Sequence, residues 1–189
     1  MGTGQGPEVG QGRTSWVSPN PRANPTDYDK DFPWFWIDLE TTGLDTDTNL
    51  ILEIVIVVTD RDLKEMDSMR LVLHHPHSIL MARSSAWCRK KFCHRSEGGN
   101  GLFGDCHLSA LSHHEAEYRM WNFFDHYSED AGRRHDTVVD VSTPLEMVRR
   151  WRPDLARRIP CRNGAHRAYD DIRDSISLMK FFKITLLSC

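Results

Sequence analysis

Two acidic residues separated by a single position stand near the start of the apolar part of the chain. Asp38 and Glu40 belong to the run FWIDLETTGLD, which begins at Phe35. Alternate side chains of a β-strand point to the same face, so a strand here projects both carboxylates together. Two adjacent carboxylates repel each other unless a cation lies between them, and oxygen ligands suit a hard divalent ion such as Mg²⁺. The alternative is a half-buried strand whose acids are merely solvated.

Three strands in a meander are expected to position these acids, over residues 34–74. The first carries the D-x-E pair. The apolar run at 50–58 predicts the second strand, interrupted only by Glu53. A turn is expected at 60–62 and a third strand at 69–73.

Helices are expected to cover this sheet. One is predicted at about residues 78–93. Ser112 and Glu115 form a capping box for a second helix, whose apolar residues recur at helical spacing. A short buried strand is predicted at 138–141. A third helix is predicted with Thr143 at its N-cap, Pro144 in its first position and Glu146 in its third.

The last predicted helix begins near Ala165 and His166 and ends at about Phe182. Its buried stripe consists of Ala168, Ile172, Ile176 and Met179. Asp171 lies next to this stripe, five residues after His166, which on a regular helix is about 140° away. His166 must therefore lie on the loop that enters the helix if both residues serve one site. Spacing alone does not choose between Asp170 and Asp171.

The D-x-E-x-T-G-L-D motif followed by a hairpin resembles the first motif of the DEDD 3′→5′ exonucleases, above all the oligoribonuclease family, of the histidine subtype. Three further stretches support the resemblance: A-W-C at 86–88, D-V-S-T at 140–143 and H-R-A-Y-D-D-I-R-D-S at 166–175. The resemblance extends over roughly residues 34–187. It implies an α/β domain of the RNase H-like exonuclease fold, a mixed sheet flanked by helices, at residues 34–189.

The resemblance also implies a set of site residues. Asp38, Glu40 and Asp171 would hold Mg²⁺ or Mn²⁺, and the family uses two such cations about 3.5–4 Å apart. His166, in the family motif H-x-x-x-x-D, would deprotonate the attacking water. A lone histidine before a helix is more often structural, but this one accompanies the other motifs.

Three more residues are implied to bind substrate. Trp87 would stack on a base, Leu44 would wedge between the last two bases, and Ser142 belongs to the D-V-S-T stretch. Stacking on an aromatic ring contributes about 1–3 kcal/mol per base. Without the resemblance, a single Trp is expected in the core.

One part of the family pattern has no match. The family's fourth carboxylate lies in an N-S-x-x-x-D segment, on a strand-helix unit before D-V-S-T, whereas residues 127–137 have no strand, no Asn-Ser and no room for a helix. The preferred interpretation is that the fourth acid is missing, and the disfavoured alternative is that Asp130 or Asp136 takes its place. Without the missing strand, either the last strand pairs directly with the Asp38 strand or an apolar sheet edge stays exposed.

Composition agrees with one soluble domain. The net charge is −3, whereas a protein that grips long nucleic acid usually carries a basic stripe; here basic residues gather only locally, at 89–91 and 149–152. Residues 1–33 are rich in Gly, Pro, Asn, Thr and Ser and are expected to form a disordered leader. They give weak support to a mitochondrial transit peptide, because basic residues are few.

The five cysteines are irregularly spaced, which favours a reducing compartment, cytoplasmic or mitochondrial, over a disulfide framework. Residues 93–112 are rich in Gly, His and Ser. Their Cys and His residues match no standard zinc spacing, so a surface insertion is the preferred interpretation.

The function expected from the resemblance is hydrolysis of short single-stranded RNA to nucleoside 5′-monophosphates by a homodimer. Because the fourth acid is missing, one cation rather than two is expected here. A catalytically impaired or inactive module that binds nucleic acid or dimerises is the alternative. A proofreading DNA exonuclease is a third, disfavoured by the D-V-S-T and D-D-I-R-D-S stretches.

Overall fold

An antiparallel sheet of three strands carries the D-x-E acids. The structure, a computed structural model, describes residues 33–128, 139–162 and 164–187. The strands are β1 (Trp34–Thr41), β2 (Ile51–Thr59) and β3 (Glu65–Val72), in the order β1-β2-β3. The predicted meander is confirmed, although β3 begins earlier than expected. The predicted leader, apart from Pro33, lies outside the described residues.

One face of the sheet is covered by the last helix, α7 (Ala168–Phe182). Trp36 of β1 and Val55 and Val57 of β2 form a core with Ala168, Ile172 and Ile176 of the helix. The indole of Trp36 donates a buried hydrogen bond of 3.0 Å to the Thr59 hydroxyl. This packing confirms the predicted apolar stripe, and it places the start of α7 over the face from which Asp38 and Glu40 project. The chain continues as a π-helical segment, Lys183–Leu187.

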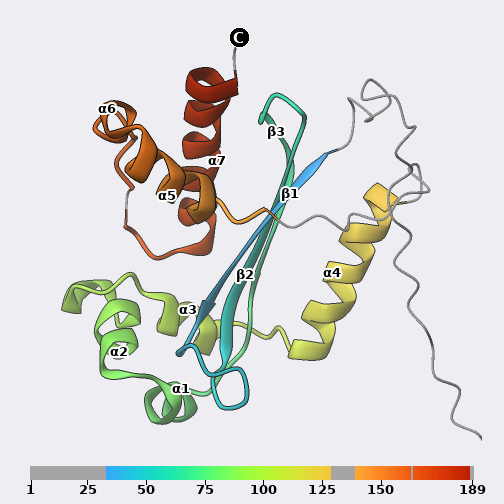
Figure 1. Ribbon diagram of the computed structural model, residues 1–189. Coiled ribbons are helices and arrows are strands. Elements are labelled where there is room, and N and C mark those ends of the chain that lie inside the picture. Colours follow the sequence, from blue (N-terminus) through green and yellow to red (C-terminus); the bar gives the residue numbers. More distant parts are fainter. Residues whose placement is uncertain (1–32, 129–138, 163, 188–189) are drawn as a thin grey trace, which may run out of the picture. The chain divides into compact units, whose positions relative to one another are not determined.

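Helix α4 (His113–Ser128) covers the opposite face of the sheet (Figure 1). Ala116 is buried there against strands β2 and β3, and the Phe35 ring of β1 lies 5.4 Å from that of Phe124. The predicted cap is present, because the Ser112 hydroxyl accepts a hydrogen bond of 3.2 Å from the Glu115 amide.

Three short helices follow β3. They are α1 (His77–Arg83), α2 (Ala86–Phe92) and α3 (Leu102–Leu108), with a 3₁₀ turn, η2, at Arg95–Glu97. The single helix predicted over 78–93 is therefore wrong, since the chain is extended at Ser84 and Ser85 and the Ser85 hydroxyl caps α2.

The surface insertion expected at 93–112 is also wrong. Leu102, Phe103 and Cys106 of α3 are buried against Leu52 of β2 and Phe92 of α2. A Gly-rich beginning concealed this apolar helix. Residues 94–98 are exposed, whereas α3 contributes to the core.

Helices α5 (Ser142–Trp151) and α6 (Pro153–Ala156) pack against α7 through Leu145, Val148 and Leu155. The predicted Thr143 cap is wrong: α5 begins at Ser142, two residues before the predicted Pro144, and the Asp140 carboxylate accepts a hydrogen bond of 2.9 Å from the Ser142 amide. The strand predicted at 138–141 is not formed at 139–141, where Val139 is exposed.

Strand β1 is an edge of the sheet in the described part of the chain. Its Ile37 and Leu39 are 52% and 44% exposed, so the apolar face of the edge strand is only partly covered by α4. Of the two outcomes expected for the missing strand, the exposed edge is the one found among described residues, and no mixed sheet is formed there. Asp130 and Asp136 lie outside the described residues.

The two isoleucines Ile172 and Ile37 provide a matched test of this packing. Ile172, on the face of α7 that packs against the sheet, is 3% exposed, and its truncation to Ala should cost about 2–5 kcal/mol of unfolding free energy. Ile37→Ala should cost less than about 1 kcal/mol, since most of that side chain already meets water. Urea unfolding of both variants measures the difference. Equal losses would mean that the outer part of β1 is covered.

Candidate metal site

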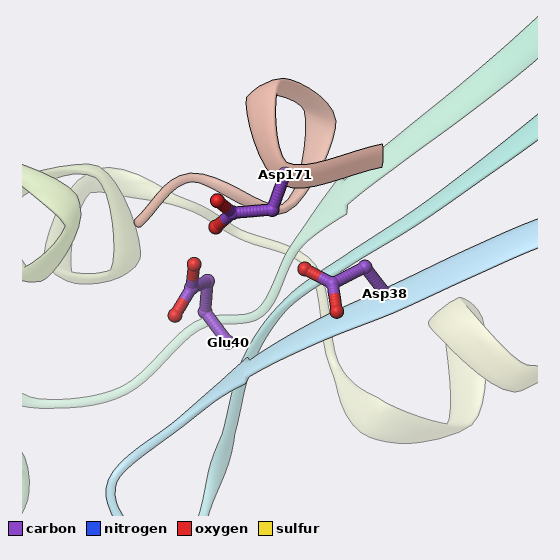
Figure 2. A group of neighbouring side chains, drawn as sticks. All are labelled: Asp38, Glu40 and Asp171. Atoms are coloured by element: carbon purple, nitrogen blue, oxygen red, sulfur yellow. The ribbon is translucent and has the colours of Figure 1, made fainter. Parts of the chain in front are cut away.

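Three carboxylates meet where β1 passes the first turn of α7. Asp38 and Glu40 project from β1, and Asp171 points toward them from the helix (Figure 2). Oxygens of the three groups all lie within 4.8 Å of one another. The alternation of β1 and the register of α7 over it create this cluster. Among the residues that the structure describes, this is the one group of His, Cys, Asp or Glu side chains arranged to hold a metal ion.

Burial and mutual repulsion disfavour the charged forms of these acids. Burial, followed by the charge of Asp171, raises the pKa of Asp38 to about 6. The same two causes, with the added charge of Asp38, raise the pKa of Glu40 to about 8. Burial also raises the pKa of Asp171, opposed by the nearby His166. A divalent cation at this point would relieve the repulsion, and carboxylate oxygens are the donors that Mg²⁺ and Mn²⁺ prefer.

His166 lies on the loop that enters α7, as its spacing from Asp171 required. The helix begins at Ala168 and not at the predicted Ala165. The backbone of His166 is in the left-handed region, with φ of 51°, which is uncommon for a residue other than glycine. The imidazole is partly buried and lines the same cavity as the acids.

Trp87 of α2 stands beside His166. The two rings lie edge to face with centroids 5.1 Å apart, and Trp87 is 56% exposed. The expectation of a core tryptophan is therefore wrong, and an aromatic face is left open next to the histidine. Leu44, in the loop after β1, is 99% exposed; it does not line the cavity.

The cavity itself has a volume of about 600 Å³. Five predicted site residues line it: Asp38, Glu40, Ser142, His166 and Asp171. Arg162, which the sequence did not single out, also lines it. The cavity therefore combines three carboxylates with the hydroxyl of Ser142 and the cationic side chain of Arg162.

A buried acid behind the cluster was not recognised as part of the site. Glu53 of β2 stands opposite Glu40 in the sheet register, and its side chain has no solvent exposure. It accepts hydrogen bonds of 2.9 Å from Arg167 Nη2, 2.6 Å from Arg70 Nε and 3.1 Å from the Ala168 amide. A charged residue inside an otherwise apolar strand was the sequence signal for it.

The cysteines do not form a zinc site among the described residues. The thiol of Cys88 donates to the Thr42 carbonyl at 3.2 Å, and that of Cys106 to the Leu52 carbonyl at 3.6 Å. The described cysteines are free, in agreement with the absence of a disulfide framework from the sequence pattern.

The protein is thus an α/β domain with a carboxylate cluster suited to a divalent cation, formed by the edge strand β1 and helix α7. No family model matches the chain. Individual proteins do match. The oligoribonuclease of Mannheimia succiniciproducens is 32% identical over 172 residues, covering 78% of this chain and 89% of that protein. The oligoribonuclease of Haemophilus ducreyi is 30% identical, with coverage of 78% and 91%.

A mitochondrial oligoribonuclease of Bos taurus is 29% identical over 173 residues, covering 78% of this chain and 70% of that protein. The chain belongs to the oligoribonuclease family. This membership implies the RNase H-like fold expected from the motifs. Of the helices in the described residues, none has the length and apolar character needed to cross a membrane.

The raised pKa values predict how pH and Mg²⁺ affect stability. The pKa values of Asp38 and Glu40 rise from 3.8 and 4.5 to about 6 and about 8 on folding. Their contribution to stability is therefore present below the unfolded values and is lost as pH rises through the folded values. Mg²⁺ competes with these protons, so it should raise the melting temperature more at about pH 8.5 than at about pH 5.

Glu40→Gln is the control for that experiment. It removes the group with the higher pKa, so the metal-free variant should lose less stability than the parent between about pH 6 and 8.5. Thermal unfolding of both proteins, with and without Mg²⁺, gives the comparison. Equal Mg²⁺ shifts at both pH values would contradict cation binding by these carboxylates.

Proposed function

We propose that this chain is a 3′→5′ exoribonuclease that hydrolyses short oligoribonucleotides to nucleoside 5′-monophosphates with the help of a divalent cation. The observation that carries the proposal is the meeting of Asp38, Glu40, Asp171 and His166 around one cavity. Relatives that match most of the chain are oligoribonucleases by name.

Asp38, Glu40 and Asp171 are proposed to hold Mg²⁺ or Mn²⁺. Such an ion polarises a phosphoryl oxygen and activates water when bound. The protein contributes the geometry: two ligands come from one strand face and the third from the first turn of a helix packed on that face. The buried surroundings strengthen the interaction of these charges with a cation.

His166 is proposed to accept the proton of the attacking water. Imidazole side chains can accept and release a proton near neutral pH, a property that suits a general base. Its partly buried ring adjoins the acids' cavity and is packed against Trp87, which restricts its orientation.

Substrate is proposed to lie between Trp87 and the acids. The open face of Trp87 offers a stacking platform for a base, which is independent of base identity. Ser142 at the start of α5 lines the cavity and is proposed to donate to a phosphate or sugar oxygen. Leu44, on its exposed loop, is proposed to contact the bases.

One strand-helix unit of the family is proposed to be missing here. In support, β1 is an edge strand and three acids, not four, gather in the described residues. Three carboxylates suffice for one cation, and we therefore expect one where the family uses two. The chain is also proposed to act as a homodimer in the cytoplasm or the mitochondrion. Its exonuclease domain is proposed to follow a leader at residues 1–33.

The exposed edge and the short acid set favour one alternative, an impaired or inactive nucleic-acid-binding or dimerising module. Incubation of the purified chain with a 5′-labelled diribonucleotide and Mn²⁺ distinguishes the exoribonuclease from this module. Release of monophosphate supports the enzyme, and a deoxyribose dinucleotide in parallel tests the choice of sugar. Binding without release, at every enzyme concentration tested, would overturn the enzyme in favour of the module.

Two adjacent aspartates allow a matched test of the metal ligands. Asp171→Ala should abolish hydrolysis and weaken Mn²⁺ binding, whereas Asp170→Ala should leave both nearly unchanged, because Asp170 lies outside the cluster. His166→Ala should lower kcat by about 10²–10⁴-fold with Mn²⁺ affinity retained. Weakened Mn²⁺ binding in the His166 variant would make this residue a ligand.

The number of bound ions tests the missing fourth acid. Calorimetric titration with Mn²⁺ should give one site per chain, and turnover should fall well below the usual enzyme median of about 10 s⁻¹. Two tight sites with ordinary turnover would mean that another acid completes the set. Asp130→Ala and Asp136→Ala would then identify it.

A further inference from the structure

The loop that carries His166 adopts a conformation that needs outside support. His166 has φ of 51°, and the left-handed region costs an ordinary residue about 1–2 kcal/mol. Such strain persists only where surrounding contacts fix the backbone. The contacts that do so come from a segment remote in sequence, residues 91–105.

Asn100 makes the closest of these contacts. Its side-chain Nδ2 donates a hydrogen bond of 2.6 Å to the His166 carbonyl and another of 3.3 Å to the Ala165 carbonyl. Its Oδ1 accepts from the Leu102 amide at 3.1 Å, at the start of α3. One amide group thus joins the strained loop to a helix whose Leu102 is fully buried.

Two neighbours reinforce the same loop. Lys91 Nζ donates to the Gly164 carbonyl at 3.0 Å. Arg167, the residue after His166, donates from Nη2 to both Asp105 of α3 and the buried Glu53, each at 2.9 Å. The three successive carbonyls of residues 164–166 thus all accept hydrogen bonds from Lys91 or Asn100.

We propose that Asn100 is a positioning residue for His166: its side-chain amide holds the left-handed backbone that aims the imidazole at the carboxylate cluster. Its catalytic part rests on the proposed function of His166. Asn100 itself does not line the cavity, so it acts through the backbone of the histidine. Ser142, Trp87 and the metal ligands have no such contact with the His166 carbonyl among the described hydrogen bonds.

The two halves of the Asn100 amide allow a clean experiment. Asn100→Asp keeps the oxygen that accepts from Leu102 but replaces the donor by an acceptor that repels the carbonyls of 165 and 166. Asn100→Ala removes both functions. Ser96→Ala is the control in the same segment, because the described Ser96 side chain bonds only to His94.

Two measurements report on the variants. Hydrogen–deuterium exchange of the peptide that covers residues 164–168 measures the protection of the loop's backbone amides and does not require catalytic activity. Steady-state kinetics on a diribonucleotide with Mn²⁺ report kcat and KM. A misplacement of about 1 Å can cost about 100-fold in rate, so we expect kcat to fall about 10- to 100-fold in Asn100→Asp, with KM and Mn²⁺ affinity unchanged and faster exchange at 164–168.

The outcome that overturns the proposal is an Asn100→Asp protein with the parent's exchange and kcat. If only Asn100→Ala is affected, the residue merely caps α3, and the proposal is wrong as well. If the parent protein hydrolyses no diribonucleotide, the proposed function fails instead. Exchange at 164–168 then still decides whether Asn100 holds the loop, since it does not depend on turnover.

Discussion

A carboxylate buried in the central strand ties the sheet to the helix that completes the site. Glu53 has no exposed side-chain surface, yet each of its oxygens accepts two hydrogen bonds, from Arg70, Arg167 and the Ala168 amide. A buried charge is tolerated only when it is paired and hydrogen-bonded. The geometry of this pairing sets where α7 begins over β2, and therefore where Asp171 stands relative to β1.

The same pairing explains why a cation is expected at the cluster of Asp38, Glu40 and Asp171 and not at Glu53. Glu53 lies opposite Glu40 in the sheet, but two guanidinium groups satisfy it. Glu40, Asp38 and Asp171 have no comparable cationic partner within ion-pair distance in the described part of the chain, and the pKa of each is raised. The negative charge of Glu53 is thus balanced by two arginines, whereas that of the three-carboxylate cluster is not. The cluster of Asp38, Glu40 and Asp171 could therefore hold a metal ion, whose positive charge the protein does not supply there itself.

Residues with a clear period were the predictable part of the fold and of the candidate site. The alternation in β1 predicted one face for Asp38 and Glu40, and the stripe of α7 predicted its packing. Predictions failed where tertiary contacts override local pattern. Ser84 and Ser85 break an otherwise helical run, and α3 is held by buried Leu102 and Cys106 despite its Gly-rich approach. The Asn100–His166 contact joins residues 66 positions apart, and no local spacing encodes it.

The position of the acids on an edge strand places a demand on the rest of the site. Asp38 and Glu40 stand on β1, which in the described sheet is hydrogen-bonded on one side only, to β2. Edge strands are less constrained than central ones, so rigidity at the acids must come from the face of the strand. Trp36 of β1 contributes to it through its hydrogen bond to Thr59 and its packing on α7. That helix is in turn held by Glu53 and the Asn100 segment. The α2–α3 region and the central strand therefore help to set the geometry of the carboxylate cluster, although neither contributes a proposed metal ligand.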